Sequence, residues 1–585
     1  MEDGLEKANG LAAAGRHAQA VAGYERSLAR NPGQPQAWYN LGNSLALLGR
    51  RAEALEALER SLTLDPTQAG AWNNRANLLA DLRRPQEAIV SFNESLRLRP
   101  GDPSTLNNRA HALAQAKRPL EAIAAYGEAY AADPKFPFLD GAWLNARLKL
   151  CDWAGVDAHL ARVAAAIGRG ERAATPFLAL GFTDDPALQA QAARTWAATL
   201  GPPGPPVPEP PPSDRIRLGY VSGDYHNHAI AWLIAEHVEL IDRSRFELTA
   251  FSYGPASDDG MRRRLSAGFE HFVDVREMPD AAIAALARER GIDIAVELTG
   301  FTQNARPGIM LARAAPIQVN YLSMPCTMGL GVMDYMLADG VVIPPGEEPH
   351  FDEKIVRLPG TYQVSDRRRE ISDRAFTRAD LGLPETGVVY CCFNNNYKFR
   401  PERFAVWVAI LRGVPGSVLW LFQNDPASTA NLRQAAASHG VDPARLVFAP
   451  PMPFPEHLAR QRLADLFLDT APYNAHTTAN DALWMGLPVL TLPGGSFGSR
   501  VAASLLTACG LPELIMPDIE TYEATAIALG RDAQRLAALK ARVLASRTAR
   551  GFDTGRFTRT VETAYETMIA RRKAGLAPDH MTLDD

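Results

Sequence analysis

Small and bulky apolar residues recur at a fixed interval of 34 positions through the first 138 residues. Ala20 is followed on this grid by Ala54, Ala88 and Ala122, and Tyr24 by Leu58, Phe92 and Tyr126. The pairing of a small with a bulky position is typical of helices that pack in antiparallel hairpins. The period therefore predicts four helical hairpins that stack into an α-solenoid over residues 1–138.

Polar positions of the same helices are also in register. In the second hairpin Trp38, Leu41, Leu45 and Leu48 follow one buried helical stripe, and Asn40 lies roughly 200° round from it. Asn74 and Asn108 repeat this position. A single such asparagine would be a solvated surface residue, but a row of amides can both donate to and accept from the backbone of an extended peptide. We identify tetratricopeptide repeats, and we predict that these three asparagines bind peptide.

The pattern changes twice after the repeats. Residues 139–200 still read as helices but leave the 34-residue grid, so we expect a helical end piece of the solenoid. Residues 201–213 are too rich in proline for a helix or a central strand, which predicts a stiff linker. A domain boundary is therefore expected here.

Short apolar runs that alternate with amphipathic helices fill the rest of the chain. They form two series, 214–375 and 376–585, with examples such as the strands expected at 216–222 and 388–393. Alternation of this kind predicts two Rossmann-like, doubly wound domains that face each other across a cleft. The fold class expected for the whole chain is therefore an α-solenoid followed by an α/β core.

Composition narrows the class of protein. The 585 residues allow three or four domains. The chain has 61 basic and 66 acidic residues and a net charge of −5, so we expect neither nucleic acid nor a membrane as a partner. Five scattered cysteines favour a reducing compartment. The N-terminus does not resemble a secretion signal, and we expect a cytoplasmic protein.

Candidate chemistry gathers where strands of the second series end. After the strand expected at 465–469 the chain turns and starts a helix at Thr477 and Thr478. A helix N-terminus offers N–H groups and a positive dipole end that suit a diphosphate. Asp481 follows one turn later on the same face, where a carboxylate can accept from ribose hydroxyls. Simple helix capping explains the threonines equally well if they are taken alone.

Other residues of this half fit the same ligand. Lys398 follows the first strand of the domain, so its ammonium group can neutralise a departing diphosphate. His457 and Arg460 are i, i+3 partners on one helix face and can hold a base. His228 lies in the first strand-to-helix loop of the other domain. Its ordinary pKa of about 6.5 suits a general base.

Long segments of the chain resemble the O-linked N-acetylglucosamine transferase family. The resemblance runs from the repeats through Gly219-Tyr-Val-Ser-Gly-Asp-Tyr, Glu297-Leu-Thr-Gly-Phe-Thr and the Asn394–Lys398 loop to His476-Thr-Thr and Pro578-Asp-His-Met. Members are inverting glycosyltransferases with tetratricopeptide repeats and a GT-B core of two Rossmann-like domains. The resemblance covers nearly the whole chain in order, which makes it specific.

The resemblance implies a role for each candidate residue. It implies that Lys398, Thr477 and Thr478 bind the diphosphate of a UDP-N-acetylglucosamine donor, and that Asp481 contacts the ribose. His457 and Arg460 would hold the uracil, and His228 would lie near sugar and acceptor. Asn395, Tyr397 and His476 occupy positions that the family uses beside the nucleotide. It also implies that no cofactor or metal is needed and that proteins are the acceptors.

Departures from the family pattern leave alternatives open. The animal enzymes have lysine where this chain has Phe454, glutamine in place of Asn395, and a long insert between the catalytic domains, for which residues 360–380 leave no room. This resembles a compact bacterial version. A protein O-fucosyltransferase of the plant SPINDLY type that uses GDP-fucose is one alternative, and an idle repeat scaffold is another. Solenoids of this kind can also self-associate, so a homo-oligomer stays open.

Overall fold

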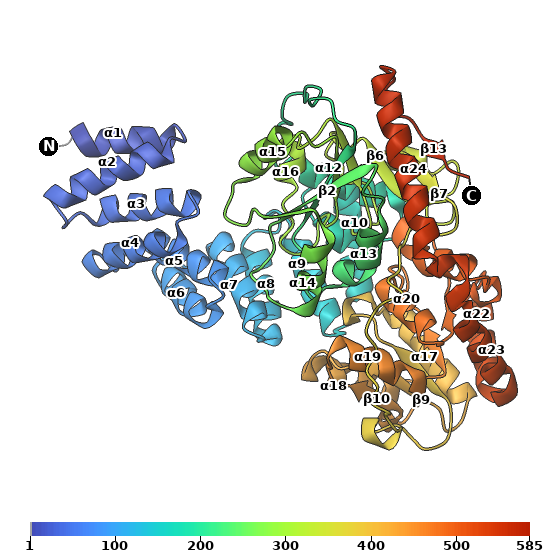
Figure 1. The fold of residues 1–585 in the computed structure, drawn as a ribbon. Helices are drawn as coiled ribbons and strands as arrows, with labels where there is room; N and C mark the ends of the chain where they lie inside the picture. Colours follow the sequence, from blue (N-terminus) through green and yellow to red (C-terminus); the bar gives the residue numbers. More distant parts are fainter. Residues whose placement is uncertain (1–2, 585) are drawn as a thin grey trace. The chain divides into compact units, whose positions relative to one another are not determined.

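The chain divides into two compact units, Met1–Arg147 and Leu148–Asp585. The computed structural model describes residues 3–584. Figure 1 shows the first unit, in blue, as stacked helical hairpins and the second as helices around parallel sheets. The α-solenoid followed by an α/β core that the sequence predicts is confirmed.

Four antiparallel hairpins build the repeat unit. Its helices are α1 (Asp3–Ala13), α2 (His17–Arg30), α3 (Pro35–Leu47), α4 (Arg51–Leu64), α5 (Ala69–Asp81), α6 (Pro85–Leu98), α7 (Pro103–Gln115) and α8 (Pro119–Ala132). Proline opens several of them because the first helical position needs no N–H donor. Gly49, at φ +77°, makes the left-handed turn between α3 and α4.

The 34-residue grid gives the core of this unit. Ala20 and Leu58 are completely buried, and Tyr24 and Phe92 are 1 % exposed. The predicted stripe of the second hairpin is correct at Leu41 and Leu45, which are buried, and wrong at Leu48, which is 40 % exposed. Leu48 lies just after the end of α3, so it leaves the face that packs on the next helix.

The first catalytic domain is built on one parallel sheet. Its strands are β1 (Ile216–Ser222), β2 (Phe246–Ser252), β3 (His271–Asp274), β4 (Ile294–Glu297), β5 (Ile317–Asn320), β6 (Tyr335–Asp339), β7 (Lys354–Leu358) and β13 (Met581–Thr582). They lie in the order β13-β7-β6-β5-β4-β1-β2-β3. Helices α13 (Ala229–Leu240), α14 (Gly260–Gly268), α15 (Asp280–Glu289) and α16 (Gly308–Leu311) connect them.

The second catalytic domain has a smaller parallel sheet. Its strands are β8 (Val389–Cys392), β9 (Val418–Phe422), β10 (Leu446–Ala449), β11 (Leu466–Leu468) and β12 (Val489–Leu490), in the order β10-β9-β8-β11-β12. The helices are α17 (Pro401–Gly413), α18 (Pro426–Ser438), α19 (Phe454–Arg460), α20 (Thr477–Trp484), α21 (Val501–Ala508), α22 (Ile519–Arg531) and α23 (Ala533–Ala545).

The end of the chain returns to the first catalytic domain. Helix α24 (Thr554–Lys573), in red in Figure 1, runs beside the strands β7 and β13. Its Tyr565 lies against Tyr220 of β1, and Thr558 is hydrogen-bonded to His237 of α13 at 2.9 Å. The sequence placed these closing residues with the second domain, whereas the structure packs them on the first. The strand β13 is too short for the apolar pattern to reveal it.

Residues 148–200 also differ from the expectation. They follow α9 (Leu139–Lys149) and form α10 (Val156–Gly168), α11 (Pro176–Phe182) and α12 (Pro186–Ala197), within the catalytic unit. Trp153 packs on Phe404 of α17, and the carboxylate of Asp184 accepts from the backbone N–H of Gly495 at 2.7 Å. These helices are therefore a layer of the catalytic unit instead of an end piece of the solenoid.

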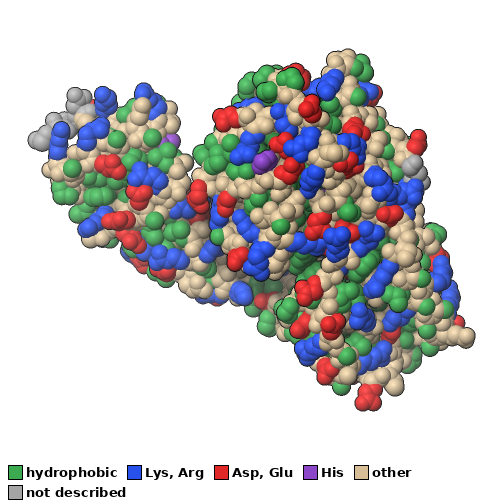
Figure 2. Space-filling view, in the orientation of Figure 1, with side chains coloured by type: hydrophobic (Ala, Val, Ile, Leu, Met, Phe, Trp, Pro, Cys, Tyr) green, Lys and Arg blue, Asp and Glu red, His purple; other side chains and the backbone are tan. Residues whose placement is uncertain are grey.

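The surface mixes both signs of charge. Basic and acidic side chains are interspersed over the face shown in Figure 2. From residue 3 to residue 584, no helix has both the length and the apolar character that a membrane span requires.

Candidate functional site

A cavity of about 390 Å³, partly open to solvent, lies between the two catalytic domains. Its walls come from the carboxyl ends of strands in both sheets, which is where ligands of doubly wound folds bind. Most of the site residues predicted from the sequence line it: His228, Asn395, Tyr397, Lys398, His457, His476, Thr477 and Thr478. The structure thus brings together side chains that lie up to 250 residues apart in the sequence.

Lys398 lies in a short 3₁₀ turn after β8, and its surroundings prepare it for an anion. Its Nζ donates to the backbone carbonyl of Asn474 at 2.7 Å and lies 3.8 Å from the ring centre of Tyr473. Burial lowers the pKa of Lys398, and the nearby Asp469 carboxylate opposes that shift. A desolvated ammonium group interacts more strongly with phosphate oxygens than a hydrated one.

Asp469 is a buried organiser of this region that the sequence reading missed. Its carboxylate accepts from the backbone N–H groups of Thr470 and Ala475 and from the Thr491 hydroxyl, each at 2.7 Å. It thereby fixes the turn between β11 and α20. Burial raises its pKa to about 6.

The N-terminus of α20 forms the wall next to Lys398. His476 is the residue before the helix, and its Nε2 is hydrogen-bonded to the carbonyl oxygen of Gly498 at 3.0 Å. A carbonyl only accepts, so Nε2 carries the proton. Burial is the main cause that lowers the pKa of His476 to about 3, which keeps the ring neutral. The Thr478 hydroxyl donates to Asn394 at 2.6 Å.

His457 on α19 lines the same cavity. Arg460 donates to its Nδ1 through Nη2 at 2.8 Å and through Nε at 3.1 Å. Because Nδ1 accepts, the proton lies on Nε2. Burial lowers the pKa of His457 to about 3, and the Arg460 charge adds to this effect. His457 is thus a neutral hydrogen-bond donor with a fixed tautomer, suited to a carbonyl oxygen of a base.

His228 lies on the wall of the first domain and caps α13. Its Nδ1 accepts from the backbone N–H of Ile230 at 3.3 Å, and burial lowers its pKa. With this hydrogen bond the proton lies on Nε2, which can donate to a ligand. The Asp224 carboxylate also lies 3.6 Å from Nδ1, and the general-base role expected of His228 stays a prediction.

Two predicted residues do not line the cavity. Arg460 is fully buried and donates to the carbonyl of Pro450 at 2.6 Å as well as to His457, so it supports His457 instead of facing a base. Asp481 is 5 % exposed, and its Oδ1 accepts from Arg369 at 2.7 Å. Burial raises its pKa to about 6. Contact between Asp481 and a ribose stays a prediction.

The cavity also has residues that the sequence reading missed. Phe177 of α11 lies 6.3 Å from Tyr397 and 6.4 Å from Tyr473, ring centre to ring centre, and lines the cavity together with them. Thr302 and Gln363 line the wall of the first domain. No sequence motif indicates Phe177, because it belongs to a helix that reads as part of the solenoid.

The asparagine row of the repeat unit is tied together by its own amides. Asn40 donates to Asn9 at 2.9 Å, Asn74 to Asn43 at 2.8 Å and Asn108 to Asn77 at 3.1 Å. Each bond joins one repeat to the preceding one. An amide has a second N–H donor and two acceptor sites on its oxygen. Peptide binding by this row stays a prediction. The row also joins successive repeats through its hydrogen bonds.

No group of three or more His, Cys, Asp or Glu side chains within residues 3–584 is arranged to hold a metal ion. The expectation that the chain works without a metal stays a prediction.

Comparison with known proteins bears on this site. The model of glycosyl transferase family 41 matches residues 208–376 and 372–561, which together make up more than half of the chain. The chain belongs to glycosyl transferase family 41. A tetratricopeptide-repeat model matches residues 5–69, 48–103 and 73–137. The family predicted from the sequence is confirmed.

The chain is also similar to named proteins over about two thirds of its length. The chain is 35 % identical over 425 residues to a probable UDP-N-acetylglucosamine–peptide N-acetylglucosaminyltransferase, SEC, of Arabidopsis thaliana, with 69 % of this chain and 44 % of that protein covered. It is 32 % identical over 394 residues to the SPINDLY protein of rice, which carries the same enzyme description, with 64 % and 41 % covered. The chain thus spans less than half the length of these two relatives.

A solved structure extends the similarity to the fold. A mutant of the Thermobaculum terrenum O-GlcNAc transferase superimposes with a TM-score of 0.70 at 28 % identity, and the match covers 92 % of this chain and 98 % of that one. The repeats and the catalytic core therefore recur together in a protein of comparable extent.

Proposed function

We propose that this family 41 protein transfers N-acetylglucosamine from UDP-N-acetylglucosamine to serine or threonine hydroxyls of proteins. The observation that carries the proposal is the cavity wall of the second catalytic domain. There His457, Lys398 and the N-terminus of α20 line one cavity, and these groups suit the base and the departing diphosphate of such a donor. The names of the relatives support the choice of donor and acceptor.

Stabilisation of the departing diphosphate is the main source of catalysis in this proposal. The acceptor hydroxyl attacks the anomeric carbon from the side opposite UDP, so the configuration inverts. The anomeric C–O bond to UDP breaks, UDP leaves with the bonding electrons, and the hydroxyl proton passes to water. Lys398 and the dipole of α20 meet negative charge that grows as the bond breaks, so they bind the transition state more tightly than the ground state. These fixed charges do the work that a metal does elsewhere, and no metal is needed.

His228 orients a reacting group in this proposal by donating from Nε2. The acceptor proteins bind to the tetratricopeptide repeats through the row of Asn40, Asn74 and Asn108. Asn395, Tyr397 and His476 contribute to the donor site as lining residues.

Titration calorimetry with UDP and with GDP tests the donor assignment. We expect UDP to bind and GDP to bind much more weakly. The fixed N–H donor of His457 lies beside the Phe393 ring, 5.3 Å away from ring centre to ring centre, and the smaller pyrimidine base fits next to this pair better than a purine. The variant Arg460→Met should weaken the binding of UDP, because His457 loses the hydrogen bonds that fix its tautomer. Preferential binding of GDP would support a fucosyltransferase and overturn the proposal.

A further inference from the structure

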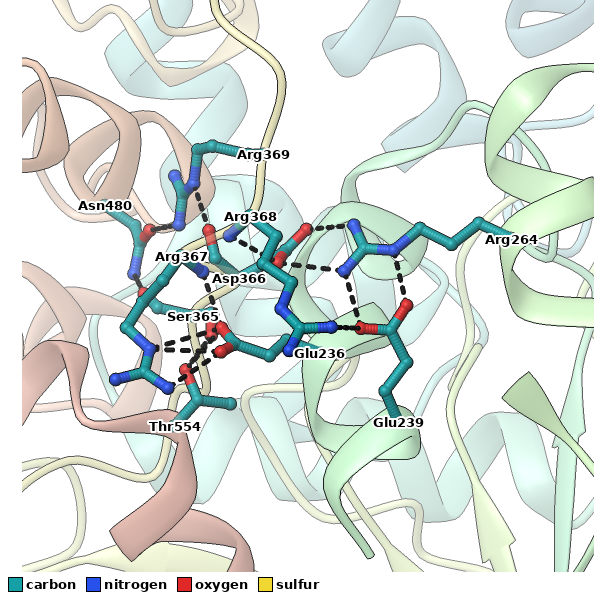
Figure 3. A network of polar contacts seen from close by, with 10 residues as sticks. All are labelled: Glu236, Glu239, Arg264, Ser365, Asp366, Arg367, Arg368, Arg369, Asn480 and Thr554. Carbon is teal, nitrogen blue, oxygen red and sulfur yellow. Dashed lines mark hydrogen bonds and ion pairs between the residues drawn. The ribbon is translucent and has the colours of Figure 1, made fainter. Parts of the chain in front are cut away.

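A buried polar network joins the two catalytic domains. It centres on the crossing segment, Ser365–Arg369, which leads from β7 toward the second domain. Figure 3 shows this segment between α13 and α14 on one side and α20 and α24 on the other. Ser365, Asp366 and Arg369 are all less than 10 % exposed.

Toward the first domain the crossing segment is tied to α13. The carboxylate of Glu236, 2 % exposed, accepts from the backbone N–H of Arg367 at 2.7 Å and from its guanidinium at 2.8 Å. Thr554, at the start of α24, donates to the same carboxylate at 3.0 Å. Asp366 forms an ion pair with Arg264 of α14.

Toward the second domain the segment is tied to α20. Arg369 donates to Asp481 at 2.7 Å, to Asn480 at 2.8 Å and to the carbonyl of Asp366 at 2.7 Å. The Asn480 amide donates in turn to the Ser365 hydroxyl (Figure 3). Each nitrogen of the guanidinium thus has an acceptor, and the group also lies 5.2 Å from the ring centre of Trp484.

The two helices joined here are the ones whose N-termini face the cavity. His228 caps α13, and His476 precedes α20. Glu236 and Arg369 lie outside the cavity lining. A buried, fully bonded ionic network is weak evidence for stability, but it can hold one geometry in preference to others.

We propose that Glu236 and Arg369 are positioning residues, which act through the crossing segment to fix α13 relative to α20. Sugar transfer needs groups from both domains in one geometry, whereas UDP binding needs chiefly the second domain. This inference rests on the proposed function for its kinetic readout. An error of about 1 Å in such an alignment costs on the order of 10²-fold in rate.

Variants that break the network from opposite ends test the proposal. Glu236→Gln and Arg369→Met should each lower kcat by about 10- to 100-fold. Glu236→Gln, which leaves the Arg369–Asp481 pair intact, should also keep the Kd for UDP near that of the wild type. The kcat of the double variant should be no lower than that of the less active single variant, because both substitutions break the same connection between the helices. Arg369→Lys keeps the charge but not the three directed bonds, so it should recover part of kcat.

Arg368→Met is the matched control. Its side chain is 63 % exposed and contacts Glu239 at 3.1 Å, which Arg264 also binds. We expect wild-type kcat from this variant. Wild-type kcat in both Glu236→Gln and Arg369→Lys would overturn the proposal. Equal losses of kcat and UDP affinity in Glu236→Gln, or additive losses in the double variant, would overturn it too.

Amide hydrogen exchange keeps the test independent of the reaction. If the wild type transferred no sugar, the proposed function would fail, but exchange in α13 and α20 would still report the connection. We expect faster exchange than in the wild type in both helices of Glu236→Gln and Arg369→Lys. In Arg368→Met we expect the exchange rates of the wild type. Unchanged exchange in either helix would overturn the inference.

Discussion

At the scale of single residues, the donor site depends on side chains whose charge is set by burial and whose tautomer is set by hydrogen bonds. Lys398 is held by Asn474 and Tyr473, and His457 by Arg460. Neither arrangement requires a ligand to form it. The groups that meet base and diphosphate are therefore preorganised, so little free energy is lost in ordering them when a donor binds.

Replacement of Lys398 by alanine should lower kcat by roughly 10²-fold or more, since one group that stabilises developing charge is lost. Turnover of labelled UDP-N-acetylglucosamine measures the effect. Lys573→Ala, at the exposed end of α24, is the control and should keep full turnover. Near-normal turnover of Lys398→Ala would contradict the role given to this residue.

The affinity for UDP should fall on the alkaline side at a lower pH than an ordinary lysine would give. Diphosphate binding needs the Lys398 cation, and burial lowers the pKa of this group, so the cation is lost as pH rises through the lowered pKa. Calorimetry between pH 7 and pH 10 measures it. Uridine lacks the phosphates and should show no such loss of affinity. An equal loss for both ligands would contradict Lys398 as its cause.

At the scale of elements, strands and helices that alternate regularly could be predicted from the sequence. The run predicted at 216–222 coincides with β1, and the run predicted at 388–393 contains β8. Short or half-exposed strands such as β3 and β13 were not predicted, because apolar periodicity is weak over two to four residues.

The candidate site shows the same division. Residues in turns at strand ends, such as Lys398 and Thr477, were predicted, because doubly wound folds bind ligands there. Phe177, Asp469 and Arg369 were not. Their roles depend on how distant elements pack, and no local spacing carries that information. Arg460 was assigned to the base because its helix face was correct, but its long side chain turns back under His457.

The asparagine row should serve acceptors and not the donor. Replacing Asn40, Asn74 and Asn108 together by alanine should raise KM for a protein acceptor and leave the Kd for UDP unchanged. It should also lower the melting temperature slightly, because three bonds between repeats are lost. Asn93→Ala, on the exposed face of α6, is the control. An unchanged KM for the acceptor would contradict acceptor binding by the asparagine row.

At the scale of the whole molecule, the boundary of the catalytic unit at residue 148 decides which fragment can work. Helices α10, α11 and α12 pack in that unit, and Asp184 accepts hydrogen bonds from the loop at Gly495 and Ser496. The prolines at 201–213 therefore mark a connection within the unit instead of its beginning.

A chain that starts at residue 148 should fold and bind UDP with the Kd of the full protein. A chain that starts at residue 201 should not, because it lacks Phe177 and exposes the apolar surface that α11 and α12 cover. Circular dichroism and calorimetry on the two fragments measure this. Normal UDP binding by the shorter fragment would contradict the assignment of residues 148–200 to the catalytic unit.

Transfer of label to protein tests the central claim most directly. The purified chain is incubated with acceptor proteins and with radiolabelled UDP-N-acetylglucosamine or GDP-fucose, and label in protein is counted. The account predicts incorporation at serine or threonine from UDP-N-acetylglucosamine, little from GDP-fucose, and its loss in Lys398→Ala. Incorporation from GDP-fucose alone, or none from either donor by a chain that binds UDP, would contradict it.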